Sequence, residues 1–213
     1  MLVPILISFS QIIFSGGSEN IIIGEMLLTP ANEMFINVVE PLDQKMLITN
    51  NKTVIYYPNE KRAFNLEYPK NDLVQQNIPK IEPLDLDYYD QLGFKKLKEI
   101  VAGDTTTIQY ISVINKKKPS LITIKTLNGN ISQIIIASNM GFANYSKLDF
   151  LEYALFDNKE YIKNYTVSLY TNNELNERTT YNISDIKKAE KKDIERIKFV
   201  IPPEINVELR SFN

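Results

Sequence analysis

Turn-forming residues recur at short, regular intervals through the first 68 residues of this chain. Ser15-Gly16-Gly17-Ser18, Pro30-Ala31-Asn32, Pro41, Asn50-Asn51 and Pro58-Asn59-Glu60 separate segments rich in Ile, Phe, Val and Tyr. Gly and Asn adopt the positive φ of tight hairpin turns, and Pro commonly ends a strand. Strands that recur at this short spacing leave no room for a crossover helix. The pattern therefore predicts an antiparallel meander rather than alternating strands and helices.

The predicted strands of this region fill the intervals between the turns. They run from Ile5 to Phe14, Ile21 to Thr29, Met34 to Val39, Lys45 to Thr49, Thr53 to Tyr57 and Ala63 to Tyr68. In the third strand, Met34, Ile36 and Val38 alternate with Phe35, Asn37 and Val39. Successive side chains of a strand point to opposite faces, so these two sets lie on opposite sides of the sheet.

The rest of the chain is predicted to add both strands and helices. Apolar residues at helical spacing predict a helix from Asp85 to Ala102, which Gly103-Asp104 would end, and a capping box at Ser146-Lys-Leu-Asp149 predicts a second from Lys147 to Asp157. Ser184 to Ile197 is predicted to be either a short helix or a charged loop. Further strands are expected at Thr105 to Asn115, Ser120 to Leu127, Ile131 to Ser138, Tyr165 to Tyr170, Thr179 to Ile183, Lys198 to Ile201 and Asn206 to Leu209. Asn128-Gly129-Asn130 carries the strongest hairpin signal.

Two absent residue types exclude most familiar active sites. The chain of 213 residues has no Cys and no His, which excludes disulfides, thiol nucleophiles, Ser-His-Asp triads and His-ligated metals. Its formal net charge of −2 gives no overall electrostatic reason to bind nucleic acid. The length suits a single domain over residues 1–213. The apolar start lacks the basic segment of a signal peptide and is interpreted as the beginning of that domain.

The remaining charged clusters have simple structural interpretations. Asp85, Asp87 and Asp90 could form a cation site or an acid–base pair, but acidic residues are also favoured at the start of a helix, and that interpretation is preferred. The basic residues at Lys116 to Lys118 and from Lys187 to Lys198 are interpreted as solvated turns. We therefore expect no cofactor, no metal and no enzymatic activity, with a carboxylate-based hydrolase as a minor alternative.

Several predicted strands are apolar on both faces, among them Ile5 to Phe14, Met26 to Leu28 and Ile134 to Ala137. Such strands can form the core of a sandwich, or they can line a sheet face that holds an apolar ligand. Met26, Met34 and Met46 add flexible thioethers, which adapt to acyl chains of varied shape.

The order of several short motifs resembles the LolA-type lipoprotein carriers of bacteria. Phe9-Ser10-Gln11 is similar to the family's Phe-x-Gln opening, and Gly24-Glu-Met-Leu-Leu28 resembles its Gly-x-Leu-Trp-Val strand. Met34-Phe-Ile-Asn-Val-Val-Glu-Pro41 resembles its next strand. The most specific segment runs from Gln44 to Pro58 and ends in Tyr-Tyr-Pro. It is similar to the family's strand, turn and aromatic strand, which end in Tyr-x-Pro. Near the C-terminus, Thr180-Tyr-Asn-Ile183 and Ile197-Lys-Phe-Val-Ile-Pro-Pro203 resemble the last strands and the Pro-Pro exit.

The resemblance implies a mainly β (α+β) fold, in which one curved antiparallel sheet forms an unclosed β-barrel and helices cover its concave face. It implies a periplasmic carrier, with its signal peptide removed, that shields lipoprotein acyl chains and shuttles them to the outer membrane. The implied partners are acylated lipoproteins, an inner-membrane exporter and an outer-membrane acceptor, with no nucleic acid, and a monomer is expected. An envelope module that senses lipid or lipoprotein is the alternative function. Three acyl chains expose on the order of 40 methylenes at ~0.8 kcal/mol each, so unassisted crossing of water is negligible.

The resemblance and the period-2 alternation together predict the residues of a lipid-binding cavity. The predicted set is Met34, Ile36, Val38, Met46 and Ile48 from the strands, covered by Phe94, Leu97 and Val101 from the first predicted helix. The alternative is that the opposite parity, with Phe35 and Val39, faces inward. Relatives commonly carry an Arg at the turn after the second strand, which is associated with closure of the lid. Here that position is Thr29 or Pro30, so we expect apolar contacts to hold the lid.

Overall fold

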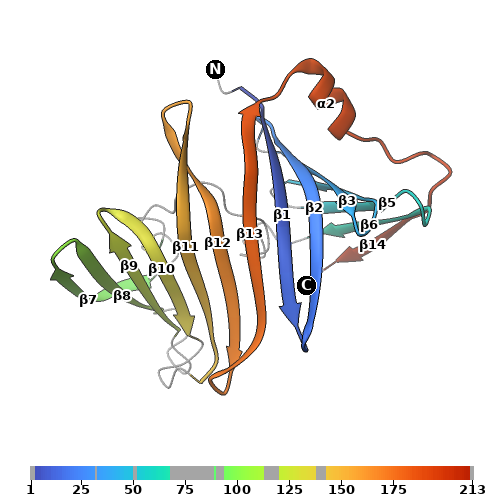
Figure 1. Ribbon diagram of the computed structural model, residues 1–213. Coiled ribbons are helices and arrows are strands. Elements are labelled where there is room, and N and C mark those ends of the chain that lie inside the picture. The colour runs from blue at the N-terminus through green and yellow to red at the C-terminus, as the bar shows by residue number, and fades with distance from the viewer. Residues whose placement is uncertain are drawn as a thin grey trace. The chain divides into compact units, whose positions relative to one another are not determined.

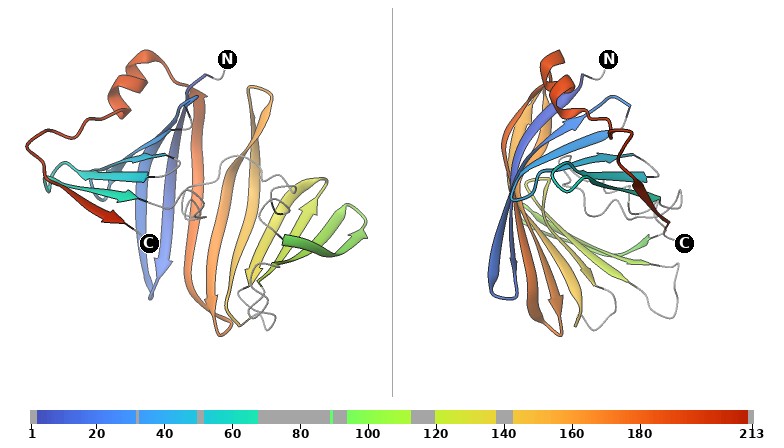
Figure 2. Two further views of the ribbon diagram at one scale, coloured as in Figure 1. Left: turned by 180° about the vertical axis from the view of Figure 1, so that it is seen from behind. Right: turned by 90° about the vertical axis from the view of Figure 1, so that its right-hand side faces the viewer.

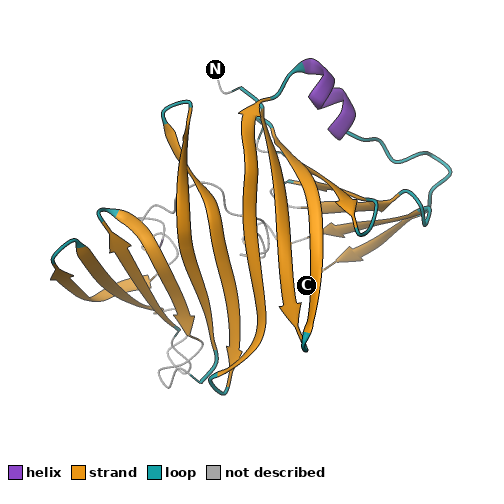
Figure 3. Ribbon diagram, in the orientation of Figure 1, coloured by secondary structure: helices purple, strands orange, loops and turns teal. Residues whose placement is uncertain are grey.

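The computed structural model describes residues 3–31, 33–49, 52–67, 89, 94–112, 120–137 and 143–211. These residues form mostly strands, with one short helix (Figures 1 and 3). The strands are β1 (Ile5–Ser15), β2 (Ser18–Leu28), β3 (Met34–Glu40), β4 (Gln44–Ile48), β5 (Lys52–Tyr57), β6 (Arg62–Glu67), β7 (Phe94–Ala102), β8 (Thr105–Ser112), β9 (Leu121–Leu127), β10 (Asn130–Ala137), β11 (Tyr145–Phe156), β12 (Lys159–Thr171), β13 (Glu174–Lys188) and β14 (Val207–Ser211). The helix is α2 (Lys191–Ile197). In the described part of the chain, no helix is long and apolar enough to cross a membrane.

The strands belong to one sheet in the order β14-β6-β5-β4-β3-β2-β1-β13-β12-β11-β10-β9-β8-β7. Neighbours from β2 to β6 and from β7 to β13 pair antiparallel, whereas β14 pairs parallel with β6. The order starts and ends on different strands, so the sheet is not closed. The predicted fold class, a mainly β protein with one unclosed antiparallel sheet, is confirmed.

The chain forms two compact units, each with its own buried core. Unit 1 comprises Met1–Gln11, Ile21–Pro79 and Ile183–Asn213, and unit 2 comprises Ile12–Asn20 and Lys80–Asn182. Unit 1 thus contains α2 with the strands β3 to β6 and β14, and unit 2 contains β7 to β12 and most of β13. Figure 2 shows the strands of both units from two further directions.

In unit 1, α2 covers one face of the sheet. Its residues Ile194 and Ile197 pack against Leu6, Leu27 and Phe35. Phe199, which follows the helix, lies with its ring centroid 6.3 Å from that of Phe35, in edge-to-face geometry, and 6.2 Å from that of Tyr56. The apolar stripe of α2 therefore has its partner on the face of β2 to β4 that carries the Phe35 side chain.

Polar contacts hold both ends of α2. At the start, the Glu190 amide donates a hydrogen bond of 3.1 Å to Asp193 Oδ2. The Asp193 carboxylate thus accepts from an N–H group that the helix itself leaves without a partner. In the last turn, Arg196 makes a bidentate ion pair with Glu25 of β2, with Nη2 2.9 Å from Oε1. The sequence left either a short helix or a loop possible for the charged segment from Ser184 to Ile197. In the structure this segment comprises the end of β13 and α2.

The predicted helix from Asp85 to Ala102 is wrong over its described second half, because Phe94–Ala102 forms β7. The register with β8 shifts by one residue between Lys96 and Lys98. This β-bulge offsets the two-residue period of the strand, so the apolar residues fall at intervals that imitate a helix. Gly103, with φ +60°, belongs to the turn between β7 and β8 rather than to a helix end. In the first half of the predicted segment, Tyr89 is helical, and residues 85–88 and 90–93 lie outside the described residues.

The predicted helix from Lys147 to Asp157 is also wrong, because Tyr145–Phe156 forms β11. A bulge between Phe150 and Tyr153 places both of these side chains, three residues apart, in the same apolar cluster. Asp149 caps no helix. It accepts a hydrogen bond of 2.7 Å from Gln133 Nε2 and pairs with Lys147 at 2.8 Å.

The other sequence predictions have mixed outcomes. The hairpin at Asn128 and Gly129 is confirmed, since both residues have positive φ, 51° and 84°, between β9 and β10. The predicted strands of the first 68 residues coincide with β1 to β6 within a few residues. The strand predicted from Lys198 to Ile201 is wrong, because those residues form the connection between α2 and β14.

We expect Gly24→Ala to lower the free energy of unfolding by about 1–3 kcal/mol, the usual cost of overpacking. A Cβ at Gly24 would lie 2.8 Å from the Asn37 carbonyl oxygen and 2.9 Å from Phe9 Cζ. The backbone oxygen cannot move without disturbing the β2–β3 ladder. Urea unfolding followed by circular dichroism measures the loss. Equal stability of the variant and the parent protein would contradict this packing.

Candidate functional site: apolar sheet faces

The five cavity residues predicted on strands lie on one face of the unit 1 sheet. Met34, Ile36 and Val38 occupy alternate positions of β3, and Met46 and Ile48 occupy alternate positions of β4. The register pairs Met34 with Ile48 and Ile36 with Met46. Directly paired residues of an antiparallel ladder share a face, so these side chains form one continuous patch.

The patch extends across neighbouring strands. One row of paired residues runs through Met26, Ile36, Met46, Ile55 and Phe64. The parity opposite to this row carries Phe35, which packs with the core beneath α2, and Val39, which is exposed. The residues predicted to line the cavity therefore lie on the face turned away from α2. Met26, Ile36 and Val38 are buried there. We name this surface, defined by Met26, Met34, Ile36, Val38, Met46 and Ile48, the unit 1 apolar face.

The three predicted covering residues lie on β7 rather than on a helix. Phe94 packs against the buried cluster of unit 2, and its ring centroid lies 6.3 Å from that of Tyr89. Leu97, at the bulge, is 53% exposed, and Val101 is 68% exposed. Of the three, only Phe94 joins an apolar core among the described residues.

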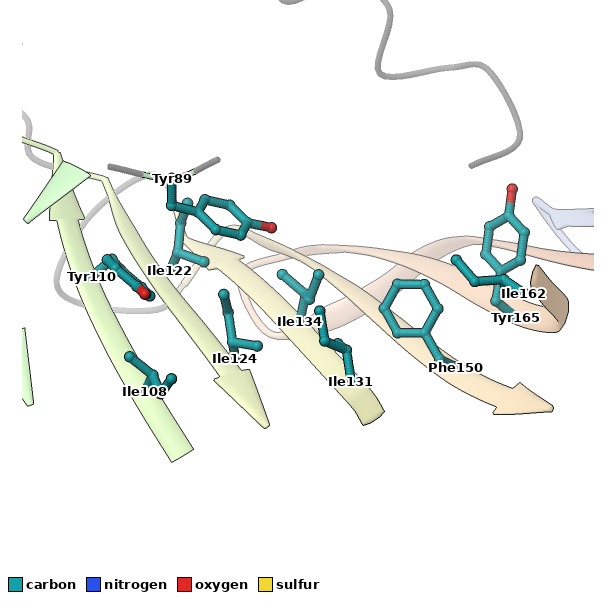
Figure 4. Packing of buried hydrophobic residues seen from close by; sticks show 10 residues of the cluster. All are labelled: Tyr89, Ile108, Tyr110, Ile122, Ile124, Ile131, Ile134, Phe150, Ile162 and Tyr165. Atoms are coloured by element: carbon teal, nitrogen blue, oxygen red, sulfur yellow. The ribbon is translucent and has the colours of Figure 1, made fainter. Parts of the chain in front are cut away.

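Of the two apolar clusters given by the described residues, the larger lies in unit 2 and was missed by sequence reasoning. Its buried residues are Tyr89, Ile108, Tyr110, Ile122, Ile124, Ile131, Ile134, Phe150, Ile162 and Tyr165 (Figure 4). Phe94, Ile136, Leu148, Tyr153, Val167 and Tyr181 pack against them and are only partly buried. All except Tyr89 lie on strands, from β7 to β13. We name this surface the unit 2 apolar face.

Register explains why these residues meet. One row pairs Ile108 with Ile124, Ile124 with Ile134, and Ile134 with Leu148. A second row continues from Phe150 through Tyr165 to Tyr181, and the last two rings stack with centroids 4.5 Å apart. On β8, Tyr110 stacks on Tyr89 at 5.7 Å. Aromatic rings therefore lie at both ends of a surface whose middle is aliphatic.

The opposite face of the same strands is largely polar. Gln133, Lys147 and Asp149 are joined by the hydrogen bond and the ion pair described above. Further along, the hydroxyls of Thr166 and Thr180 lie 3.4 Å apart. An antiparallel sheet with one polar and one apolar face is built to keep the polar side in water and the apolar side covered.

Tyr153 carries the clearest pKa shift on the unit 2 apolar face. Its hydroxyl donates a hydrogen bond to the Ile131 carbonyl oxygen. Burial, with a smaller contribution from Glu160, raises the pKa of Tyr153 to about 12. Burial also raises the pKa of Tyr181, again with a contribution from a nearby glutamate, Glu177. Both phenols are therefore neutral at physiological pH.

Alkaline pH should destabilise the protein through Tyr153. Its folded pKa of about 12 exceeds the unfolded value of about 10, so this contribution is complete below pH 10 and is lost toward pH 12. We expect Tyr153→Phe to lose about 1 kcal/mol at neutral pH, from the missing hydrogen bond, and to show a smaller further loss above pH 10. Urea unfolding at both pH values measures this. The same alkaline loss in both proteins would show that Tyr153 does not titrate on unfolding.

The other candidate residues have varied outcomes. Asp85, Asp87, Asp90 and Lys116 to Lys118 lie outside the described residues. Within the part that is described, no group of three or more acidic side chains is arranged to hold a metal ion. At the position of the family Arg, the Thr29 hydroxyl accepts a hydrogen bond of 3.3 Å from the Glu33 amide, within its own turn. The described ion pair between α2 and the sheet is Arg196 with Glu25, and it lies beside the apolar contacts of Ile194 and Ile197.

Comparison with known proteins gives structural relatives only. No protein-family model matches the sequence, and no curated protein matches it. A domain assigned as an outer membrane lipoprotein-sorting protein from Vibrio parahaemolyticus superposes with a TM-score of 0.58 at 12% identity, covering 91% of this chain and 90% of the other. A LolA superfamily protein from Nitrosomonas europaea gives 0.58 at 10% identity, over 90% and 89%. A DUF1329 family protein from Desulfovibrio piger gives 0.59 at 11% identity, over 92% and 89%. Across nearly its whole length, the chain therefore has a LolA-like fold.

Proposed function

We propose that this protein is a non-enzymatic carrier that shields the acyl chains of lipoproteins against its apolar sheet faces. The observation that carries the proposal is the unit 2 apolar face, a continuous aliphatic and aromatic surface opposite a polar face on the same strands. The LolA-like fold adds support, because one structural neighbour is described as a lipoprotein-sorting domain.

The chemistry of the unit 2 apolar face suits a ligand that must be released again. Apolar contact is non-directional and roughly proportional to buried area, so it tolerates chains of different length and position. At ~0.8 kcal/mol per buried methylene, one acyl chain can be held without polar bonds to its body. The partly buried aromatic rings of Phe94, Tyr153 and Tyr181 provide contact area at little cost in conformational entropy.

The unit 1 apolar face is proposed as a second contact region for the same class of ligand. Its side chains include Met26, Met34 and Met46, which reshape easily around a flexible chain. The proposed cavity residues there are Met34, Ile36, Val38, Met46 and Ile48, with Phe94, Leu97 and Val101 of β7 retained as candidates on unit 2.

Shuttling between membranes follows from this chemistry as part of the proposal. The proposed location is the periplasm, the donor an inner-membrane lipoprotein exporter and the acceptor a protein or bilayer at the outer membrane. Such a carrier acts as a monomer and needs no cofactor. Its affinity for the acyl chains must exceed that of water and fall below that of the acceptor.

Val38→Glu tests the unit 1 apolar face. We expect it to weaken binding of a fluorescent fatty acid at least tenfold, because a carboxylate at a buried apolar position repels the chain. Val39→Glu is the matched control, since Val39 is the next residue of β3 and is exposed on the other side. Circular dichroism establishes that both variants are folded. Unchanged probe affinity in folded Val38→Glu would remove this face from the proposed site.

Native mass spectrometry of gently purified protein tests the proposed function as a whole. The carrier proposal expects an additional mass equal to an acylated species, which detergent removes and added lipoprotein restores. A protein that purifies free of lipid, gains no acylated mass and is bound only to another protein would contradict the carrier and favour the sensing module.

A further inference from the structure

Strand β7 is the last strand in the sheet order, and one of its backbone edges is open among the described residues. It pairs with β8 on one side, from Phe94 opposite Ser112 to Ala102 opposite Thr105. On its other side, no strand pairs with it in the part of the chain that the structure describes. An open edge presents N–H and C=O groups at the spacing of the next strand, so it is a template for an added strand.

The edge carries an unneutralised basic strip. Lys95 and Lys98 lie on the face that carries Gln109 and Ile111 of β8, opposite the apolar cluster. Lys125 of β9 lies on the same face, paired with Thr107. All three side chains are exposed. Among the described residues, none of the three ammonium groups has an ion pair or a hydrogen bond.

Besides the lysines, β7 carries exposed apolar residues that charge does not shield. On the other face, Lys96 pairs with Glu99 at 2.7 Å, so that side of the strand carries no net charge from the pair. Val101 shares this face and is 68% exposed, whereas Ile100, 46% exposed, lies on the face of Lys98, and Leu97 at the bulge is 53% exposed. Beyond the bulge at Leu97, the register with β8 is regular through Ala102. This stretch offers regular strand backbone and apolar side chains to a partner.

The charges decide which partner fits. A second copy of β7 paired with the first would bring Lys95 and Lys98 close to the same lysines of the other copy, and like charges on paired strands repel. The bulge and the lysines thus disfavour self-association. Bulges and charged side chains commonly have this effect on edge strands. An extended segment that carries Asp or Glu on one face and apolar residues on the other meets attraction at both faces.

We propose that β7 is a docking edge for an extended acidic segment of a partner protein, which adds to the sheet as a strand. The backbone of Lys98 to Ala102 supplies the ladder bonds, and Lys95 and Lys98 select for carboxylates, while Lys125 on β9 adds to the positive charge of the same face. The inference does not depend on acyl binding, so the proposed carrier function and this docking edge can each fail alone.

The experiment uses the full chain, labelled for NMR, and two blocked peptides of alternating residues, one of Glu and Val and one of Lys and Val. We expect the Glu peptide to shift the amide signals of β7 and β8, to slow hydrogen exchange along β7, and to bind about tenfold more tightly than the Lys peptide, because complementary charges set partner choice. Lys95→Glu with Lys98→Glu should reverse that preference.

Lys187→Glu with Lys188→Glu is the matched control, because it makes the same charge change at two exposed residues of β13. The control should keep the parent's preference for the Glu peptide. Three results would each overturn the inference: no binding of the Glu peptide at millimolar concentration, equal binding of both peptides, or signal changes located away from β7 and β8. Lysine-dependent binding to phosphatidylglycerol vesicles without peptide binding would also overturn it, by assigning the strip to a membrane surface.

Discussion

Ile134→Ala should lower the free energy of unfolding by about 2–5 kcal/mol, among the largest losses for any single truncation in this chain. Ile134 is 1% exposed and lies between Ile124 and Leu148 in the unit 2 apolar face. Removing three carbon atoms there takes away apolar contact and leaves a cavity that the paired strands cannot close. Urea unfolding followed by circular dichroism measures the change.

Ile135→Ala provides the internal comparison. Ile135 is the next residue of β10, faces the opposite side and is only partly buried beside Lys147. We expect it to lose about 1 kcal/mol, since less apolar area leaves the core. Similar losses for the two variants would mean that the two faces of β10 contribute equally to stability, contrary to the core as described.

Ile136→Glu should reduce the affinity for a fluorescent fatty acid by at least tenfold while the protein stays folded. Ile136 packs against the unit 2 cluster but remains partly accessible, opposite Ser146 and Ile122. A carboxylate there must either lose its water or push the acyl chain away, and both outcomes oppose binding. The measurement is equilibrium titration of the probe, with circular dichroism to confirm the fold.

Ile135→Glu is the matched control. It makes the same substitution at the adjacent residue, whose side chain lies on the polar face. Its carboxylate meets Lys147 rather than the apolar cluster. The proposal expects near-parental affinity for this variant. Equal weakening by both substitutions would mean that charge alone, and not the face it occupies, governs probe binding.

Local signals were enough to predict the first half of the sheet. Turn residues such as Gly16 and Asn59 set the ends of strands, and alternation on β3 placed Met34, Ile36 and Val38 on a common face. These inferences hold because each hairpin is short and its two strands neighbour one another in sequence. The face of β3 with Phe35 could be told from the other only when the position of α2 was known.

The two wrong helices have one physical cause. Bulges at Leu97 and between Phe150 and Tyr153 add a residue to the strand, so side chains three apart share a face. A local pattern of that kind is indistinguishable from one turn of a helix. The competing information lies in the partner strands, β8 and β12, which pair along the whole of each segment.

The unit 2 apolar face was missed for a related reason. Strands were predicted at β8, β9 and β10 and over parts of β12 and β13, whereas β7 and β11 were predicted as helices. The alternation of Ile108 with Tyr110, or of Ile122 with Ile124, was present in the sequence. What was absent was the register that aligns these pairs across β8 to β13. Assigning the inward-facing residues of each predicted strand, and carrying that assignment from one hairpin to the next, could have found this face.

The central claim is that an acyl chain lies along the unit 2 apolar face, and methyl NMR with a spin-labelled fatty acid tests it most directly. With isoleucine methyl groups labelled, the bound spin label broadens every methyl signal close to it. The claim predicts strong broadening of Ile122, Ile124, Ile134 and Ile136 and little broadening of Ile135, which shares β10 but points to the polar face. Binding of the fatty acid that broadens Ile135 and spares those four methyl groups would contradict the claim.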